Sequence, residues 1–326
     1  MKRKMLVVVV LCLVSWFLWF VLQERALPKY ILGKGVWIVN LDVVDPEDLL
    51  RQAQDAGVDY FLVKTHEGRY WTWEKGFGWN PYNTHRQIER FVKACHQAGI
   101  RVFAWGYVYG NAPEEEAQKA IDSLNLGADG YVWDVEAEFA YKPEAAAILC
   151  ETVKKYVEEK CPEKILGYST FSRVHRGGEV PWAEKLPLEV FDRHCDVAMP
   201  QVYWREFGVS PEKAVYQMCQ AWLQMQESWG PGKEPAPIIP IGQAYRRDKG
   251  VKYTPPEEVS RFLEAAKGYY GVSLWKAELM APEHWGALKN GPERAVNPRN
   301  SKRSVLITLC SLGIAIIIWK LTRHRG

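Results

Sequence analysis

The sequence lacks the marks of several protein classes. It has no CxxC pair, no cysteine and histidine spacing typical of a zinc site, and no glycine-rich nucleotide-phosphate motif. Its 42 Lys and Arg residues nearly balance 39 Asp and Glu residues, and the net charge of +3 makes no case for a nucleic-acid partner. We therefore expect no metal, no other cofactor and no nucleic acid.

The seven cysteines form no recognisable framework. Cys12 and Cys310 lie inside long apolar runs near the two ends of the chain. The five cysteines between those runs are an odd number, and several fall on predicted helix faces, where cysteine behaves as a small apolar residue. One disulfide among these five is compatible with the sequence, but the spacing selects no pair.

Long apolar runs lie near both ends of the chain. Residues 5–22 are apolar apart from Ser15 and follow three basic residues, so we expect a membrane anchor over residues 1–29, with a cleaved signal sequence as the alternative. Residues 304–319 are apolar around the whole predicted helix, which favours a C-terminal transmembrane helix over residues 304–322 rather than a buried helix. Residues 291–303 form a basic linker to that helix.

Basic residues flank both apolar runs on the side away from the centre of the chain. Such flanks favour the cytoplasmic side of a membrane. We therefore expect the protein at the cell membrane, held in the lipid bilayer by both terminal helices, with residues 30–290 outside the cytoplasm. A cytoplasmic position of this central segment is the alternative, because reduced cysteines would tolerate it.

Between the apolar runs, β-rich segments alternate eight times with amphipathic helical segments. The predicted strands are residues 35–41, 58–64, 100–109, 130–136, 164–169, 196–203, 237–245 and 271–275. Most of the intervening helices begin at Pro, which suits the first turn of a helix. Eight such units over roughly 250 residues predict one (β/α)8 TIM barrel. An open doubly wound sheet is the alternative, but its glycine fingerprint is missing after the first strand.

Acidic, amide and aromatic residues follow the carboxyl ends of the predicted strands. In a TIM barrel these ends meet at one rim, which carries the active site. Asp134 and Glu136 leave the same face of the fourth strand, about 7 Å apart along it. The other rim residues that we expect to bind a substrate are Asn40, Asp42, Glu67, Tyr107, Gln201, Tyr203, Tyr245 and Trp275.

This combination of residue types suits a carbohydrate. Carboxylates and amides bind sugar hydroxyl groups, and flat aromatic rings cover the apolar C–H faces. The chain has 15 Trp and 16 Tyr, and the loop over residues 70–79 is dense in such rings. We expect these loop rings to contact a ligand, because a loop needs no such rings for its own fold. Covering the barrel top or meeting lipid headgroups is the alternative.

Two neighbouring carboxyl groups can hydrolyse a glycosidic bond, with one of them held protonated to donate to the leaving oxygen. Desolvation and a neighbouring anion both raise the pKa of a carboxyl group. We therefore assign the general acid/base role to Glu136. Asp134 is expected to stay ionised and stabilise positive charge at the sugar, and Asp42 and Glu67 are reserve carboxylates.

The fourth strand resembles two groups of glycoside hydrolases. Residues 133–136, Trp-Asp-Val-Glu, resemble the Asp-x-Glu strand of the family 25 lysozymes, which cleave the muramic-acid linkage of peptidoglycan. Residues 129–136 resemble the family 18 chitinase signature, and Gln-Val-Tyr at 201–203 and Gly-Val-Ser-Leu-Trp at 271–275 resemble later strands of its plant-type members. The family 18 resemblance implies that the N-acetyl group of the substrate is the nucleophile, oriented by Asp and Tyr, with Glu as the acid.

We therefore expect a membrane-tethered glycoside hydrolase that cleaves a glycan containing N-acetylhexosamine, most simply peptidoglycan. Tyr203, Gln201 and Trp275 would shape the sugar subsite. Val132 stands where the family 18 signature has its first inner Asp. The missing acid supports an alternative function, a catalytically inactive glycan-binding barrel at the cell surface.

Overall fold

The computed structural model describes residues 31–74, 82–171, 185–230, 234–247 and 252–292. Within these ranges eight parallel strands close into a barrel, which confirms the predicted (β/α)8 fold. The barrel strands are β1 (Gly33–Ile38), β2 (Tyr60–Glu67), β4 (Arg101–Val108), β5 (Gly130–Val135), β6 (Ile165–Phe171), β7 (Val197–Gln201), β8 (Ile241–Gln243) and β9 (Gly271–Trp275). The ring closes at β1, which pairs with β9 on one side and with β2 on the other.

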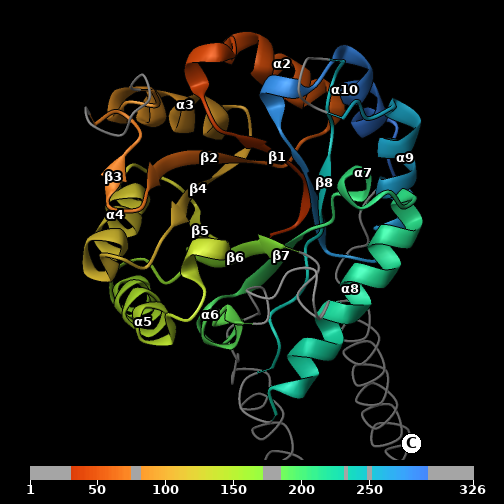
Figure 1. Cartoon of the computed structure of the whole chain (residues 1–326). Coiled ribbons are helices and arrows are strands. Elements are labelled where there is room, and N and C mark those ends of the chain that lie inside the picture. The colour runs from red at the N-terminus through yellow and green to blue at the C-terminus, as the bar shows by residue number, and fades with distance from the viewer. Residues whose placement is uncertain (1–30, 75–81, 172–184, 231–233, 248–251, 293–326) are drawn as a thin grey trace, which may run out of the picture.

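A ring of helices surrounds the strands (Figure 1). These helices are α2 (Pro46–Ala56), α3 (His85–Gln97), α4 (Pro113–Asn125), α5 (Pro143–Lys160), α6 (Leu188–His194), α8 (Pro211–Ser228), α9 (Pro256–Ala265) and α10 (Pro282–Lys289). Six of them begin at Pro, whose missing N–H would have no partner in the first turn in any case. The predicted alternation of strands and helices therefore holds through all eight units.

Short elements that the sequence did not predict lie at the rim of the barrel. They are β3 (Tyr70–Trp71), α7 (Trp204–Phe207) and the 3-10 turns η1 (Leu41–Val43), η2 (Ala137–Phe139) and η4 (Ala277–Leu279). Strand β8 is shorter than the predicted strand over residues 237–245. Pro237 and Pro240 have no backbone N–H to donate to a neighbouring strand, so regular pairing begins only at Ile241.

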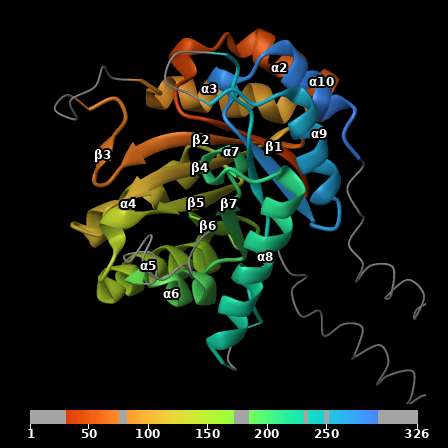
Figure 2. The ribbon, with the colours of Figure 1, turned by 45° about the vertical axis from the view of Figure 1, so that its right-hand side comes forward.

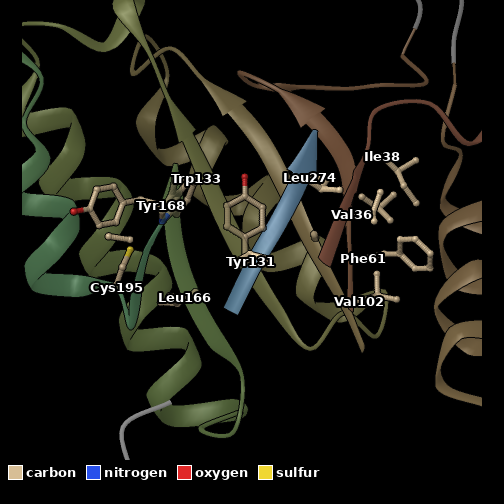
Figure 3. Close-up of a cluster of buried hydrophobic side chains, with 14 of the residues drawn as sticks. Val36, Ile38, Phe61, Val102, Tyr131, Trp133, Leu166, Tyr168, Cys195 and Leu274 are labelled. Atoms are coloured by element: carbon tan, nitrogen blue, oxygen red, sulfur yellow. The ribbon is translucent and has the colours of Figure 1, made fainter. Parts of the chain in front are cut away.

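Two apolar layers bury both faces of the sheet. The inner layer, which fills the barrel, contains Trp37, Tyr60, Leu62, Phe103, Trp105, Val132, Ile165, Val197, Met199 and Ile241. The outer layer lies between the strands and the helices, and Figure 3 shows part of it, including Val36, Phe61, Tyr131, Trp133 and Tyr168. Because neighbouring residues of a strand point to opposite faces, β5 sends Val132 and Asp134 inward and Tyr131 and Trp133 outward.

The first strand and the last helix of the described chain meet at one end of the barrel. Lys34 Nζ in β1 donates to the carbonyl oxygen of Leu288 in α10 at 2.7 Å, and Lys289 pairs with Asp55 of α2 at 2.6 Å. Figure 2 shows α2, α10 and α9 side by side, in agreement with their mutual contacts. The described chain therefore enters and leaves at the amino ends of the strands, opposite the rim.

The predicted membrane segments, residues 1–29 and 304–322, lie outside the described residues, as does the linker from residue 293 onward. None of the helices that the structure describes is long and apolar enough to cross a bilayer. The terminal transmembrane helices therefore stay a prediction.

Candidate active site

A cavity of about 310 Å³ lies at the carboxyl ends of the barrel strands. Its lining residues are Trp37, Val39, Lys64, Trp105, Tyr107, Asp134, Glu136, Ser169, Gln201, Tyr203, Ile241, Trp275 and Lys276. Every strand of the closed barrel contributes to this wall. Residues that are far apart in the sequence therefore meet only because the barrel closes.

Asp134 and Glu136 share the side-chain amide of Gln201. Gln201 Nε2 donates to Asp134 Oδ1 at 3.2 Å and to Glu136 Oε1 at 3.0 Å, and it lies 3.4 Å from Ser169 Oγ. Only 5% of Asp134 is exposed to solvent. An amide N–H₂ group has two hydrogens to donate, so Gln201 orients both carboxylates without adding charge to the site.

Burial raises the pKa of both carboxyl groups. For Asp134 desolvation is the largest cause, and the neighbouring charge of Glu136 adds to it. For Glu136 desolvation is again the largest cause, and the hydrogen bond donated by Gln201 opposes it. Like charges in one buried site do not ionise independently, so one carboxyl can hold a proton while its neighbour is ionised. This is the charge state that acid/base chemistry at a sugar linkage requires.

Lys64 of β2 is a cavity residue that the sequence analysis did not identify. Its side chain is 10% exposed, and Nζ lies 2.5 Å from Glu67 Oε2 and 5.2 Å from the centre of the Trp105 ring. Its positive charge opposes the larger effect of burial on the pKa of Asp134 and of Glu136. The sequence did contain a signal for this position. Tyr60 and Leu62 point into the barrel, and the two-residue alternation of a strand predicts the same direction for Lys64.

Three tryptophans from three strands form the apolar part of the cavity wall. The ring centres of Trp37 and Trp105 are 5.3 Å apart, and Trp275 lies 5.8 Å from the first and 5.6 Å from the second. Trp37 and Trp105 are almost fully buried and donate their ring N–H groups to Ser273 Oγ and to the carbonyl oxygen of Ile38. Trp275 is the accessible ring of the three, supported from behind by the other two.

Tyrosines complete the polar part of the wall. The hydroxyl group of Tyr107 donates a hydrogen bond to the carboxylate of Glu138 in η2. Burial raises the pKa of Tyr203, and the nearby Tyr245, Asp134 and Glu136 add to that shift. Tyr245 is buried near Tyr203, and the residues that line the cavity do not include it. Tyr107 and Tyr203 therefore face a ligand as neutral hydroxyl groups.

Besides Tyr245, three predicted rim residues lie away from the cavity wall. Asn40 caps η1, where its Oδ1 accepts a hydrogen bond from the backbone N–H of Asp42 at 2.8 Å. Asp42 also accepts a hydrogen bond from Gln87 of α3. Glu67 binds Lys64 and accepts a hydrogen bond from the Tyr109 hydroxyl at 2.8 Å, and it lines a neighbouring hollow of about 490 Å³. The residues that the barrel does bring together in the cavity are Tyr107, Asp134, Glu136, Gln201, Tyr203 and Trp275.

The expected ligand contact of the ring-rich loop is wrong for Trp71, whose ring is buried. Trp71 is 6% exposed and stacks on Trp73, with ring centres 4.6 Å apart. Both rings contact His85 of α3, and Nζ of Lys119 in α4 lies 4.4 Å from the centre of the Trp71 ring. These rings pack the loop onto two helices. Residues 75–81 of the same loop lie outside the described residues.

His66 points away from the cavity. A register shift in the pairing of β2 with β4 falls between Lys64 and His66 and breaks the two-residue alternation. The His66 ring is fully buried in contact with Tyr131, which faces the outer layer, and its Nδ1 lies 2.8 Å from the carbonyl oxygen of Gly68. Among the residues that the structure describes, no cluster of His, Cys, Asp and Glu is arranged to hold a metal ion.

No family model and no curated protein matches the sequence. Solved structures do share the fold. A GH18 chitinase from Pseudoalteromonas aurantia has a TM-score of 0.54 and 15% identity, over 78% of this chain and 97% of that one. A thermostable chitinase domain from Pyrococcus furiosus has a TM-score of 0.57 and 17% identity, over 79% and 93%. The spore cortex-lytic enzyme of Bacillus cereus has a TM-score of 0.55 and 12% identity, over 82% and 77%. Identities this low establish the fold alone, and the chain thus shares its (β/α)8 barrel with these proteins.

Proposed function

We propose that the protein is a glycoside hydrolase that cleaves a glycan containing N-acetylhexosamine, with Glu136 as general acid/base. The observation that carries this proposal is the carboxylate pair at the end of β5. Asp134 and Glu136 lie in a rim cavity, share the amide of Gln201 and have raised pKa values because they are buried. A carboxyl that stays protonated near neutral pH can donate to a glycosidic oxygen.

The cavity residues suit the route that the family 18 resemblance implies. Glu136 is the more accessible acid, so it would protonate the leaving oxygen. Asp134 is deeper and would orient the N-acetyl group, whose carbonyl oxygen attacks the anomeric carbon, and the Tyr203 hydroxyl would hold that carbonyl. Water then attacks the same carbon and gives its proton to Glu136, which restores the acid, while the bond from this carbon to the carbonyl oxygen breaks and the N-acetyl group is regenerated. Trp275 would pack against the apolar face of the sugar ring.

We infer peptidoglycan as the substrate. The likeness to chitinases and to a spore cortex-lytic enzyme supports a polysaccharide substrate in general. The Asp-x-Glu strand at residues 133–136, which also resembles that of the family 25 lysozymes, supports the muramic-acid linkage in particular.

The proposed activity can be tested with the full-length protein in detergent micelles. The protein is incubated with N-acetylglucosamine oligosaccharides and with peptidoglycan fragments, and the products are analysed by mass spectrometry. We expect shortened glycans with new reducing ends from the wild type and none from Glu136→Gln, although the variant unfolds at the same temperature or higher. Equal turnover by the two proteins would remove Glu136 from the mechanism.

We also propose that the barrel is held at the cell membrane with its cavity outside the cytoplasm. The support comes from the apolar runs at residues 5–22 and 304–319 and from their basic flanks. Protease added to intact cells should then digest the barrel. Protection of the barrel until the cells are lysed would place it in the cytoplasm.

A catalytically inactive glycan-binding barrel is the second candidate, and the position of Val132 favours it. Val132 is fully buried on the inward face of β5, two residues before Asp134, and so supplies no carboxyl group beside that acid. Retention of the protein on insoluble peptidoglycan without release of reducing ends would support this candidate over the first.

A further inference from the structure

The cavity holds a buried lysine that the proposed reaction leaves without a role. Lys64 lines the same cavity as Asp134 and Glu136, and its side chain is 10% exposed. A cationic amine is strongly hydrated, so burying it in a barrel costs free energy unless nearby groups compensate. The ion pair with Glu67 offsets this cost, but a sugar, which is neutral along most of its surface, does not explain why the ammonium group lies beside two carboxylates.

The contacts of Lys64 fix where its charge lies. Nζ is 2.5 Å from Glu67 Oε2 and 5.2 Å from the centre of the Trp105 ring. Glu67 is itself held by the next strand, because Tyr109 donates to its Oε1 at 2.8 Å. A chain of contacts from Tyr109 through Glu67 to Lys64 therefore holds the ammonium group beside the cavity.

Position 132 supplies neither a charge nor a hydrogen bond to the carboxylate pair. The inward residue next to the carboxylate pair on β5 is Val132, which can neither share a proton with Asp134 nor donate a hydrogen bond to it. Gln201 orients the two acids, but an amide carries no net charge. The other lysine of the cavity wall, Lys276, lies with Nζ 5.5 Å from the centre of the Trp275 ring.

We propose that Lys64 is a positioning residue that supplies the counter-charge for the Asp134–Glu136 pair, and that Glu67 moderates this charge from the opposite side. The positive charge of Lys64 opposes the effect of burial on Asp134, so it favours the state in which Asp134 is ionised and the single proton of the pair resides on Glu136, where a leaving oxygen needs it. This inference rests on the proposed hydrolase function for its role in catalysis, but the charge balance itself exists without substrate.

The surrounding charges are consistent with this assignment. After burial and the charge of Glu136, Lys64 is the next largest influence on the pKa of Asp134, which it lowers, whereas Glu67 raises it. For Glu136, Lys64 again acts to lower the pKa and Glu138 acts to raise it. The tyrosines nearby stay neutral up to high pH because burial raises their pKa values. The titratable and charged groups around the pair and Lys64 are His66, Glu67, Tyr82, Tyr107, Tyr109, Glu138, Tyr203, Tyr245, Lys276 and Glu278.

Two substitutions should move the same titration in opposite directions. Lys64→Met keeps an unbranched side chain over Trp105 but removes the positive charge, so it should raise the pKa of Asp134 by about one unit, a tenfold change in proton affinity. Glu67→Gln keeps a hydrogen-bonding group for Lys64 and Tyr109 but removes the negative charge, so it should lower that pKa. Lys64→Arg keeps the positive charge and should leave the titration close to that of the wild type.

The titration can be measured by carbon NMR of the side-chain carboxyl groups in the full-length protein in detergent micelles, without any glycan. Signals of the pair are identified by their loss in Asp134→Asn and in Glu136→Gln. An unmoved titration in Lys64→Met, or a shift of the same sign in Lys64→Met and Glu67→Gln, would overturn the proposal. If Lys64→Met does not fold, the direction of the shift in Glu67→Gln decides alone.

Activity measurements separate this inference from the proposed function. If the wild type cleaves a glycan, the acidic limb of its kcat/KM profile should move to higher pH in Lys64→Met and return in Lys64→Arg, which loss of packing alone would not produce. A profile that does not move refutes the role of Lys64 and leaves the hydrolase in place. If no glycan is cleaved but the carboxyl titrations shift as stated, the counter-charge stands and the hydrolase proposal fails.

Discussion

Two sites with buried titratable groups lie on opposite faces of the barrel sheet, His66 on β2 and the Asp134–Glu136 pair at the end of β5, and they differ in what surrounds them. His66 lies between the sheet and the helices. Its Nδ1 is hydrogen-bonded to the carbonyl oxygen of Gly68, and its Nε2 is hydrogen-bonded to the Tyr131 hydroxyl group. Asp134 and Glu136 sit inside the barrel, where one amide serves two carboxylates beside a cavity. Both groups have strongly shifted pKa values because of burial. A shifted pKa therefore does not mark an active site unless like charges and access to a ligand accompany it.

The largest effect should separate the two regions by activity. Replacing Glu136 with Gln removes the proton donor and should lower kcat/KM for a cleaved glycan by about a thousandfold. Replacing His66 with Gln should leave kcat/KM within about threefold, because this ring does not face the cavity. Steady-state kinetics on one defined oligosaccharide tests both. A large loss of kcat in the His66 variant at full folding would contradict the division.

The next largest effect should be a loss of stability without a change in the cavity, and it should come from the outer layer around His66 and Tyr131. A Cβ atom added at Gly106 would lie 2.3 Å from His66 Nε2 and 2.4 Å from the Tyr131 hydroxyl oxygen, so Gly106→Ala should lower the free energy of unfolding by about 3 kcal/mol. Gly268→Ala is the matched control, because an added Cβ there meets nothing within 4 Å. Denaturant titrations of the two variants measure the difference. Equal free energies of unfolding in the two variants would show that His66 and Tyr131 can shift to accommodate the added methyl group.

Acid should weaken the outer region through His66. Desolvation lowers the pKa of this ring from 6.5 to about 3 in the folded protein, so the unfolded chain binds the extra proton between these values. Stability from this group is complete above pH 6.5 and is lost as the pH falls toward 3, by about 3 kcal/mol at pH 4. His66→Gln should flatten that slope in unfolding measurements. A slope of unchanged steepness would assign the acid sensitivity to other groups.

The smallest effect should come from the inner region and have the opposite sign. The pKa of Asp134 is raised in the folded protein, so the unfolded chain releases its proton first and stability falls as the pH rises above the ordinary carboxyl range. Asp134→Asn removes this cost and should increase stability by about 1 kcal/mol at pH 8, while abolishing most activity. At pH 3 the gain should vanish. Thermal unfolding at both pH values is the measurement, and a loss of stability at pH 8 would contradict the prediction.

Local signals in the sequence predicted most of the fold. Strand alternation, prolines at helix starts and glycines at helix ends depend on neighbouring residues, so they can be recognised without knowing the packing. The predicted strand boundaries were wrong where the hydrogen bonding between neighbouring strands is interrupted, as at Pro237 and Pro240 before β8. The register shift after Lys64 could not be predicted either, because it depends on how β2 pairs with β4.

The site was less predictable because its contacts span the chain. The end of β5 pointed to Asp134 and Glu136, but the bond from Gln201 to Asp134 joins residues on strands two positions apart in the barrel. Lys64 was missed because a lysine in an apolar strand looks like a surface residue until the barrel closes around it. Trp71 was predicted to contact a ligand but is buried. The residues that cover it, His85 of α3 and Lys119 of α4, come later in the sequence, so the loop sequence alone could not show the burial.

The meeting of β1 and α10 at the amino end of the barrel has a mechanical consequence. Anything attached to either flank of the described chain pulls on the same end, where Lys34 and Lys289 fasten the last helix to the first strand and to α2. The cavity faces the other way, roughly 20 Å farther along the barrel axis. A load carried from one flank to the other would therefore bypass the rim, and the site would keep its shape while its support is under tension.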